Sequence, residues 1–324
     1  MTTVETTWDG LPIATDHPRG SGIVLRRPTG DGDELEFLLL HRHHHGPAYE
    51  GDWAWTSPSG ARLPDEPVLV GAERELLEEA GLAGVPLRPV DLSGGWAVFA
   101  AQVPAGTAIV IDPEHDRFAW LSREAALPLI LPESVHANFL KGSSVPLPEL
   151  VFRPLDRSDF ADLLRWQHTA HVREWWRDTP TDLAAMERKY GPRIDGATPV
   201  RVHVLLVDGR PAGHFQHYRT ADFADYGAAV DDLEAVAIDY AIGAPDLIGR
   251  GIGTQAIWAY VRDVVLPAHP EAPRVVATPK VGNLPSIRAL EKAGFQRVRD
   301  VVLPPSAGGH EEAVCVLDRR RIFG

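Results

Sequence analysis

The sequence predicts two mixed α/β domains in one chain. Its 324 residues are many for one hydrophobic core and ample for two. Strand-like runs alternate with amphipathic helical stretches on both sides of residues 141–149, a short Pro-containing segment that lacks periodicity. We therefore expect domains at residues 1–144 and 151–324, joined by a linker at residues 145–150.

In the first domain we expect five short strands and one helix. The helix covers residues 67–80, because Pro67 occupies its first turn and Gly81 lies just past its end. The strands are apolar runs at residues 22–26, 37–41, 53–56, 96–101 and 118–121.

In the second domain we expect helices and strands in mixed order, with no internal repeat. Helical stretches cover residues 157–177, 181–190, 253–265 and 285–293. Strands are expected at residues 200–207, 213–219, 233–242, 274–278, 298–303 and 313–317. The single cysteine, Cys315, falls in the last strand and is expected to be a buried side chain there.

Composition and charge exclude several classes of protein. No apolar run approaches the roughly 18 residues of a membrane span, and the polar N-terminal residues do not resemble a signal peptide. One cysteine permits no internal disulfide framework, so we expect a cytoplasmic protein without a membrane partner. Residues 1–145 carry 10 basic and 21 acidic side chains, which suits divalent cations and is a poor match for nucleic acid.

The most specific pattern in the first domain is a group of acidic residues on its helix. Glu75, Glu78 and Glu79 have the spacing i, i+3, i+4, so they share one helix face. Their mutual repulsion costs a few tenths of a kcal/mol per pair, which a divalent cation with oxygen ligands would offset. A solvated acidic face explains three glutamates alone, but not the full string Gly60-x5-Glu66-x7-Arg74-Glu75-Leu76-x-Glu78-Glu79-x-Gly81-Leu82.

That string resembles the signature box of the Nudix hydrolase family, over roughly residues 18–140. The resemblance implies an α/β/α sandwich and Mg²⁺- or Mn²⁺-dependent hydrolysis of a nucleoside diphosphate linked to another moiety. It also implies an orienting ion pair between Glu66 and Arg74, with Glu75 and Glu78 as catalytic residues. The implied metal ligands are Gly60, through its carbonyl, with Glu75, Glu78, Glu79 and Glu114; an exposed loop position is the alternative for Glu114.

Aromatic and histidine residues near this box leave alternatives open. Trp53 and Trp55 lie two apart in an expected strand, where they stack on a base or, for at least one of them, pack in the core. The run of histidines at residues 43–45 cannot place every ring on one side of a strand. These rings line the substrate entrance or are solvated.

The second domain has a glycine-rich turn at residues 247–254, ahead of an expected helix. Glycines let successive N–H groups point at a phosphate, and the helix N-terminus adds the positive end of its dipole. With its neighbours, this turn resembles the GCN5-related N-acetyltransferase family, whose fold is a mixed-sheet α/β domain, over about residues 150–320. Within that family the likeness is to the aminoglycoside 6'-N-acetyltransferases, carried by Glu174-Trp175-Trp176, Gly213-His-Phe-Gln-His-Tyr218 and Ile238-Asp239.

This second resemblance implies an acetyl-CoA site and an amine acceptor. Asp239 would be the base for the acceptor amine or the anchor for its ammonium, because an ammonium must lose a proton before it attacks a thioester. Trp175 and Trp176 would wall the acceptor site. The implied cofactor-binding residues are Val236, Ala237, Ile238, Gly249, Arg250, Gly251, Ile252, Gly253, Thr254 and Asn283.

Two positions depart from the family pattern. Ile248 replaces the usual Gln or Arg at the start of the loop, and Leu290 replaces the tyrosine that protonates the leaving thiolate. Transfer then proceeds through water or another group, or this domain binds acetyl-CoA without turnover.

We therefore expect a bifunctional enzyme that acts on a nucleotide-type molecule and on an amine-bearing, cationic small molecule. Glu174, Asp178 and Asp239 are acidic candidates for the acceptor site. Two alternatives remain: one domain is a ligand sensor that regulates the other, or the acceptor is a lysine- or siderophore-type amine. The sequence names neither the nucleotide nor the amine, and it does not give the oligomeric state.

Overall fold

A computed structural model describes residues 5–7, 10–30, 32, 34–176 and 179–324 of the chain. The chain divides into two units, residues 1–147 with 320–324, and residues 148–319. Each unit contains one seven-stranded sheet with helices, so the prediction of two mixed α/β domains is confirmed.

The sheet of the first unit has β1 at its centre. The strand order is β3-β2-β1-β6-β5, with β4 also paired to β1 and β7 to β2. Strands β1 and β6 are parallel, and the other pairs are antiparallel. The strands are β1 (Gly20–Pro28), β2 (Leu35–Arg42), β3 (Trp55–Thr56), β4 (Ser59–Ala61), β5 (Arg88–Asp91), β6 (Ala97–Gln102) and β7 (His115–Ser122).

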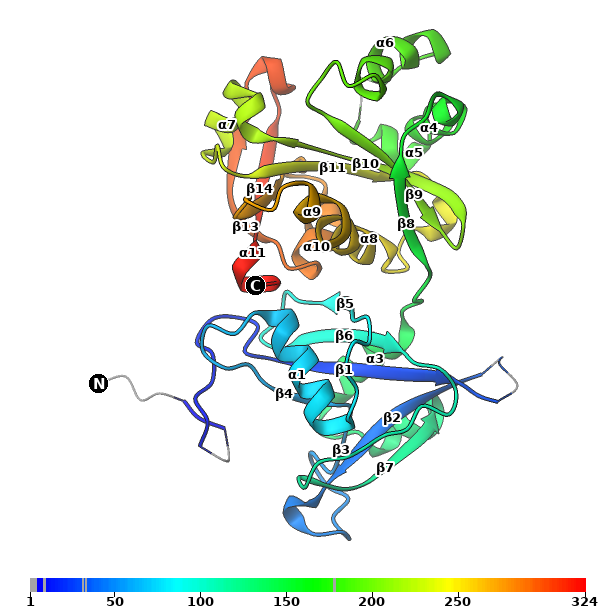
Figure 1. Ribbon diagram of the computed structural model, residues 1–324, viewed down its shortest axis with the longest axis vertical. Helices are drawn as coiled ribbons and strands as arrows, with labels where there is room; N and C mark the ends of the chain where they lie inside the picture. The colour runs from blue at the N-terminus through cyan, green and yellow to red at the C-terminus, as the bar shows by residue number, and fades with distance from the viewer. Residues whose placement is uncertain (1–4, 8–9, 31, 33, 177–178) are drawn as a thin grey trace. The chain divides into compact units, whose positions relative to one another are not determined.

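Two longer helices accompany this sheet. Helix α1 (Val68–Ala80) crosses one face in Figure 1, and α3 (Glu133–Ser144) lies behind the sheet. Helix α3 was not expected, because Gly142 and two serines weaken its propensity. Gly142 is required by packing, since a Cβ there would lie 2.4 Å from a methyl of Val24 on β1. The shorter elements are η1 (His43–His45), α2 (Arg123–Ala126) and η2 (Leu127–Leu129).

The sheet of the second unit has the order β13-β14-β12-β11-β10-β9-β8. Strands β11 and β12 are parallel, and all other neighbours are antiparallel. Cys315 is fully buried in β14, as expected. The strands are β8 (Leu150–Pro154), β9 (Arg201–Val207), β10 (Arg210–Arg219), β11 (Val236–Ile242), β12 (Arg274–Ala277), β13 (Gln296–Val302) and β14 (Glu311–Asp318).

One helix of the second unit is shorter than the sequence indicated. The expected helix at residues 157–177 breaks after Gln167, because Thr169 turns to extended backbone and its hydroxyl donates to the Trp166 carbonyl at 2.7 Å. The helices are α4 (Phe160–Gln167), α5 (Ala170–Arg173), α6 (Leu183–Ile194), α7 (Ala224–Val230), α8 (Ile252–Tyr260), α9 (Leu266–Ala268), α10 (Leu284–Lys292) and α11 (Arg319–Ile322). A π-helical segment, η6 (Val261–Val265), joins α8 to α9, and the 3-10 turns are η3 (Arg157–Asp159), η4 (Thr220–Asp222), η5 (Pro245–Leu247) and η7 (Pro305–Ala307).

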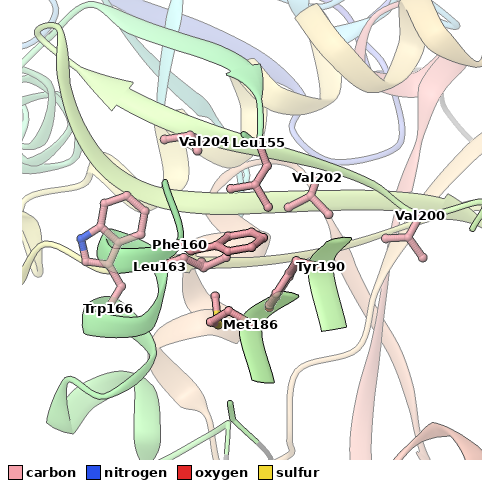
Figure 2. Close-up of a cluster of buried hydrophobic side chains, with 9 residues drawn as sticks. All are labelled: Leu155, Phe160, Leu163, Trp166, Met186, Tyr190, Val200, Val202 and Val204. Atoms are coloured by element: carbon pink, nitrogen blue, oxygen red, sulfur yellow. The ribbon is translucent and has the colours of Figure 1, made fainter. Parts of the chain in front are cut away.

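One hydrophobic cluster fixes α4 and α6 on the sheet. Figure 2 shows apolar side chains of both helices meeting valines that lie on or beside β9. Burying such side chains is the main favourable contribution to folding. The cluster consists of Leu155, Phe160, Leu163, Trp166, Met186, Tyr190, Val200, Val202 and Val204.

Several expected boundaries differ from those observed. Strand β3 begins at Trp55, because Trp53 has a left-handed backbone that ends an extended run. Strand β11 begins at Val236, since the Asp232 carboxylate accepts hydrogen bonds from the N–H groups of Glu234 and Ala235 and holds a turn before it. Residues 141–144 of the aperiodic segment belong to α3, and Leu150 belongs to β8. Among the described helices, none combines the length and apolarity of a membrane span.

Candidate active sites

Helix α1 brings the acidic face of the first unit to a cleft. Pro67 has extended backbone before the first turn, and Gly81 ends the helix in the left-handed conformation with φ of 69°. The helix contacts β1 and β4. Side chains on its acidic face line a cleft of about 490 Å³, which is the first candidate site.

An ion-pair network fixes α1 beside β4. Arg74 donates from Nε and Nη2 to the two oxygens of Glu66 at 2.8 and 3.0 Å, and from Nη2 to the Ala61 carbonyl at 3.0 Å. The N–H of Leu63 donates to Glu66 at 2.9 Å. Burial acts to raise the pKa of Glu66, but the hydrogen bonds from Arg74 and Leu63 outweigh it and leave the pKa lowered. Glu66 therefore stays ionised and holds Arg74 in place.

Two glutamates of the acidic face are buried. Glu75 is 7% and Glu79 is 4% exposed, whereas the side chain of Glu78 is 53% exposed. Burial raises the pKa of Glu75 to about 7, although Arg74 donates to it at 2.8 Å. Burial also raises the pKa of Glu79 well above its usual range, although the N–H of Ser59 donates to it at 2.7 Å. The protein therefore supplies these carboxylates with less positive charge than their ionised forms require.

Gly60 leaves the space that the Glu75 carboxylate fills. A Cβ at Gly60 would lie 2.1 Å from the carboxylate carbon, which is closer than atoms can approach. Only glycine therefore permits β4 to lie this close to the buried carboxylate.

Acidic, basic and aromatic side chains complete the lining of the cleft. Asp112 and Glu114 reach it from the loop before β7, and Arg42 from the end of β2. The Arg42 Nε is buried, and no described residue accepts a hydrogen bond from it. Trp53 and Trp96 are 50% and 38% exposed at the cleft. Over the described ranges, no three His, Cys, Asp or Glu side chains are grouped as a metal site in their present positions.

In the second unit, strands β11 and β12 part after two paired positions. Val236 pairs with Val275 and Ala237 with Val276, but β11 continues to Ile242 while β12 ends at Ala277. The opposite edge of β11 remains paired with β10 along its whole length. From Ile238 onward, main-chain groups on the β12 side of β11 are therefore directed into an opening between the two strands.

The glycine-rich turn after β11 has the backbone of an anion site. Gly249 and Gly251 are left-handed, with φ of 75° and 81°, and α8 begins at Ile252. A Cβ at Gly249 would meet nothing within 4 Å, so the space beside this turn is open. The nine-residue helix α8 adds the positive end of its dipole.

A cavity of about 760 Å³ lies beside β11, with Asp239 in its lining. Gln216 on β10 donates to Asp239 at 2.7 Å, and Arg193 on α6 donates to Gln216 at 2.6 Å. Burial raises the pKa of Asp239, although the hydrogen bond from Gln216 and the charge of Arg193 oppose that shift. A carboxylate with a raised pKa accepts a proton more readily than a free aspartate does.

Aromatic and hydroxyl groups line the same cavity. Trp175 and Trp176 reach it from the segment after α5. The hydroxyls of Tyr240 and Ser286 lie 2.7 Å apart, and both residues belong to the lining. Asn283 begins α10, where its side chain accepts a hydrogen bond from the Ser286 N–H at 3.2 Å.

Comparison with known families matches both units. The model of the NUDIX domain matches residues 16–141, and the model of the acetyltransferase (GNAT) domain matches residues 156–303. The chain joins a NUDIX domain to a GNAT acetyltransferase domain. Both domains belong to enzyme families.

Curated relatives match the GNAT domain. An aminoglycoside N(6')-acetyltransferase type 1 of Klebsiella pneumoniae is 28% identical over 177 residues, which cover 54% of this chain and 85% of the relative. A kanamycin resistance protein of Rhizobium radiobacter is 36% identical over 86 residues, covering 26% of this chain and 73% of the relative.

Solved structures are similar to each domain in turn. The aminoglycoside acetyltransferase AAC(6')-Ib in complex with coenzyme A has 27% identity and a TM-score of 0.46, over 53% of this chain and 96% of its own. A Caenorhabditis elegans Ap4A hydrolase binary complex has 23% identity and a TM-score of 0.32, over 38% of this chain and 93% of its own.

The NUDIX cleft brings together most of the residues singled out from sequence. Its lining includes Gly60, Arg74, Glu75, Glu78, Glu79 and Glu114. The ion pair between Glu66 and Arg74 is present. The roles of these residues as metal ligands stay a prediction. Sequence reasoning missed Arg42, Trp96 and Asp112; of these, only Asp112 carried a signal, as it lies two residues before Glu114.

The histidines and tryptophans near the box have separate places. His41 is fully buried, with ring nitrogens 2.7 Å from Asp116 Oδ1 and 2.8 Å from the Tyr49 carbonyl oxygen. The histidines of η1 are exposed on a 3-10 turn rather than a strand, outside the cleft lining. Trp55 is buried in the core, whereas Trp53 lines the cleft, so the two do not share a strand face.

The GNAT cavity gathers five predicted residues, namely Trp175, Trp176, Ile238, Asp239 and Asn283. Val236 and Ala237 are paired with β12, so the opening beside β11 begins only at Ile238. The loop residues Gly249, Arg250, Gly251, Ile252, Gly253 and Thr254 lie outside the cavity lining, at the start of α8.

Four further positions qualify the expectations for the acceptor site. Glu174 is exposed and outside the cavity lining, and Asp178 lies outside the described residues. Leu290 is fully buried in α10, so the position of the usual tyrosine contributes no hydroxyl. Sequence reasoning gave Tyr240 no role, because its approach to α10 depends on tertiary packing.

Proposed function

We propose that the NUDIX domain hydrolyses a nucleoside diphosphate linked to another moiety, with Mg²⁺ or Mn²⁺. The observation that carries this proposal is the pair of buried carboxylates, Glu75 and Glu79, whose raised pKa values mark a deficit of positive charge. A hard divalent cation supplies that charge through oxygen ligands. The carboxylate oxygens that line the cleft are the ligand type that such an ion prefers.

The residues that would hold the cation are Gly60, through its carbonyl oxygen, Glu75, Glu78, Glu79 and Glu114. When bound, the cation would neutralise the diphosphate and make a water molecule acidic enough to attack it. The bonds of Arg74 to Glu66 and to the Ala61 carbonyl hold α1 against β4. The glutamates on the acidic face of α1 therefore keep fixed positions. Glu78, exposed at the cleft, or Glu114 would accept a proton from the attacking water.

The test is hydrolysis of a panel of nucleoside diphosphate derivatives with Mg²⁺. The double variant Glu78→Gln, Glu79→Gln should lose the activity, whereas Glu124→Gln, an exposed glutamate of α2, should keep it. The NUDIX unfolding transition of the double variant, followed by calorimetry, reports whether its NUDIX domain is folded. Undiminished hydrolysis in the double variant would remove this mechanism.

For the GNAT domain we infer acetyl transfer from acetyl-CoA to a primary amine of a small cationic molecule. The observation that carries this inference is the opening between β11 and β12, which ends beside Asp239. The pantetheine arm of acetyl-CoA has two amide groups, and these can pair there with the main chain of β11 from Ile238 onward. The turn at Gly249–Gly253 and the N-terminus of α8 suit the pyrophosphate. The curated relatives, which are named for aminoglycosides, support an amine on a cationic acceptor.

Asp239 takes a proton from the acceptor ammonium, so that the free amine attacks the thioester carbonyl. The tetrahedral adduct loses the second proton of its nitrogen to solvent as the carbon–sulfur bond breaks, and the sulfur leaves as a thiolate. The hydroxyl of Tyr240 donates a proton to that thiolate and is reprotonated through Ser286, 2.7 Å away. Tyr240 thereby replaces the hydroxyl that Leu290 does not supply. Trp175 and Trp176 wall the acceptor side of the cavity.

The test is thiol release from acetyl-CoA, which should require an added amine. Asp239→Asn should lower the rate by about 100-fold or more, in the range of general base catalysis. Asp263→Asn, at an exposed position near the end of α8, is the matched control. A rise in melting temperature with acetyl-CoA, with no amine releasing thiol, would replace this proposal with a ligand sensor.

A further inference from the structure

Trp53 has a backbone conformation that its side chain disfavours. Its φ is 66°, in the left-handed region, where bulky side chains are rare. The other described non-glycine residues with positive φ are Asp65, Asp208 and Asp231, and aspartate tolerates this region better. The Trp53 side chain is 50% exposed, so core packing does not account for it either.

The position of Trp53 is set by contacts of its loop. Its N–H donates to the carbonyl of Leu131 at 2.8 Å, just before α3, and the N–H of Ala54 donates to the Gly51 carbonyl at 3.1 Å. These bonds hold the indole at the NUDIX cleft, whose lining it shares with the box glutamates. Strain that is maintained at the wall of a cleft indicates a functional side chain.

Polar groups of α3 border the same part of the cleft. Ser134 and Asn138 are four residues apart, so they lie on one face of the helix, and both line the cleft. Within the part of the chain that the structure describes, no hydrogen bond engages the Asn138 amide. An amide offers both a donor and an acceptor to the edge of a heterocyclic base.

The same cleft also contains a basic side chain, that of Arg42. Arg42 follows a β-bulge in the pairing of β2 with β7, and such bulges redirect side chains at sites. Its side chain lines the same cleft as the buried carboxylates of Glu75 and Glu79. The cleft therefore presents an aromatic face, an amide, a guanidinium and carboxylates.

We propose that Trp53 is the stacking platform for the nucleobase of the substrate, with Asn138 at the base edge and Arg42 at the polyphosphate. This inference rests on the proposed hydrolase function and narrows its substrate to nucleoside polyphosphates that bind through the base. The indole stacks on the base, and the strained backbone is retained because it directs the ring into the cleft.

The test compares binding of ATP, GTP, CTP and UTP with binding of tripolyphosphate, which has no base. EDTA is present, so that neither metal nor turnover contributes. In Trp53→Gly the Kd of the preferred nucleotide should rise by about 5- to 150-fold, the range for one base on an aromatic ring. The Kd of tripolyphosphate should not change, and thermal stability should not fall, since glycine adopts this φ freely. Trp120→Phe, with its ring beside Arg27 on the sheet, should bind like the wild type.

Three outcomes would overturn the subsite. These are equal binding of nucleotide and tripolyphosphate by the wild type, wild-type nucleotide affinity in Trp53→Gly, and an equal loss for both ligands. Hydrolysis of a diphosphate by the wild type would leave the proposed function standing in each of these cases. Base-dependent binding with no hydrolysis of any diphosphate would instead keep the subsite and remove the hydrolase.

Discussion

The substitution Gly60→Ala should displace the Glu75 carboxylate. The added Cβ would lie 2.1 Å from the carboxylate carbon, and ordinary contact begins at 3.4 Å, so the carboxylate must move by about 1.3 Å. Arg74 holds the carboxylate at 2.8 Å, and the side chain is buried, so this movement breaks an existing contact. A misplacement of about 1 Å in a catalytic group costs about 100-fold in rate, or about 2.7 kcal/mol.

The assay has a kinetic part and a thermodynamic part. Hydrolysis by Gly60→Ala should fall about 100-fold, while acetyl transfer by the same chain is unchanged. In calorimetry, the NUDIX transition is the one that acetyl-CoA does not shift. Gly60→Ala should lower its unfolding free energy by about 1–3 kcal/mol, the cost of overpacking. In a Glu75→Ala background the same change should cost less than about 0.5 kcal/mol.

Gly30→Ala is the matched control, because a Cβ at Gly30 would meet nothing within 4 Å. It should leave hydrolysis and stability unchanged. Equal destabilisation by Gly60→Ala in both backgrounds would refute the reasoning, since the two residues would then not compete for space. Unchanged hydrolysis in Gly60→Ala would refute the placement of Glu75 in the reaction.

Three further predictions concern the GNAT domain. Burial lowers the pKa of His203 to about 4 and that of His217 to about 3, so both are neutral when folded but protonated below about pH 6.5 when unfolded. The unfolding free energy should therefore fall as the pH is lowered from about 6.5 to about 4. The fall should be about 1.4 kcal/mol per histidine for each pH unit below the unfolded pKa. Urea titrations of His217→Gln should show a smaller fall than those of the wild type. Tyr240→Phe should lower kcat for thiol release about 100-fold with an unchanged KM for acetyl-CoA, and a changed KM with unchanged kcat would contradict its role as proton donor. Gln216→Leu removes a hydrogen bond that stabilises ionised Asp239, so the acid limb of the kcat/KM profile should shift to higher pH; an unshifted limb would exclude Asp239 as the base.

Local signals made the NUDIX helix predictable. Pro67 and Gly81 mark its two ends, and the spacing of the glutamates depends only on helical geometry. Gly60 was singled out from sequence as a metal ligand through its carbonyl, and that role stays a prediction. No local pattern records that it also leaves room for the side chain of Glu75, 15 positions later in the chain. Base stacking by Trp53 was one of the alternatives that the sequence left open, but its left-handed backbone was not predicted, because it is held by a hydrogen bond to the distant Leu131 carbonyl.

In the GNAT domain, the glycine turn and Asp239 were identified from short motifs. The parting of β11 from β12 was not, because it depends on how far two strands distant in sequence stay paired. The pairing of Tyr240 with Ser286 likewise joins β11 to α10 through packing. Helix α3 was missed because Gly142 suits the contact with Val24 rather than helix propensity.

The turn between β11 and α8 has a consequence for how this domain changes over evolutionary time. An anion held by peptide N–H groups is indifferent to most substitutions in the loop, apart from those at Gly249 and Gly251, whose positive φ restricts them. The acceptor cavity is built instead from side chains on several separate elements. Single mutations in the cavity can therefore change which amine is accepted and leave the acetyl-CoA site unchanged. New amine substrates are then accessible through one substitution at a time.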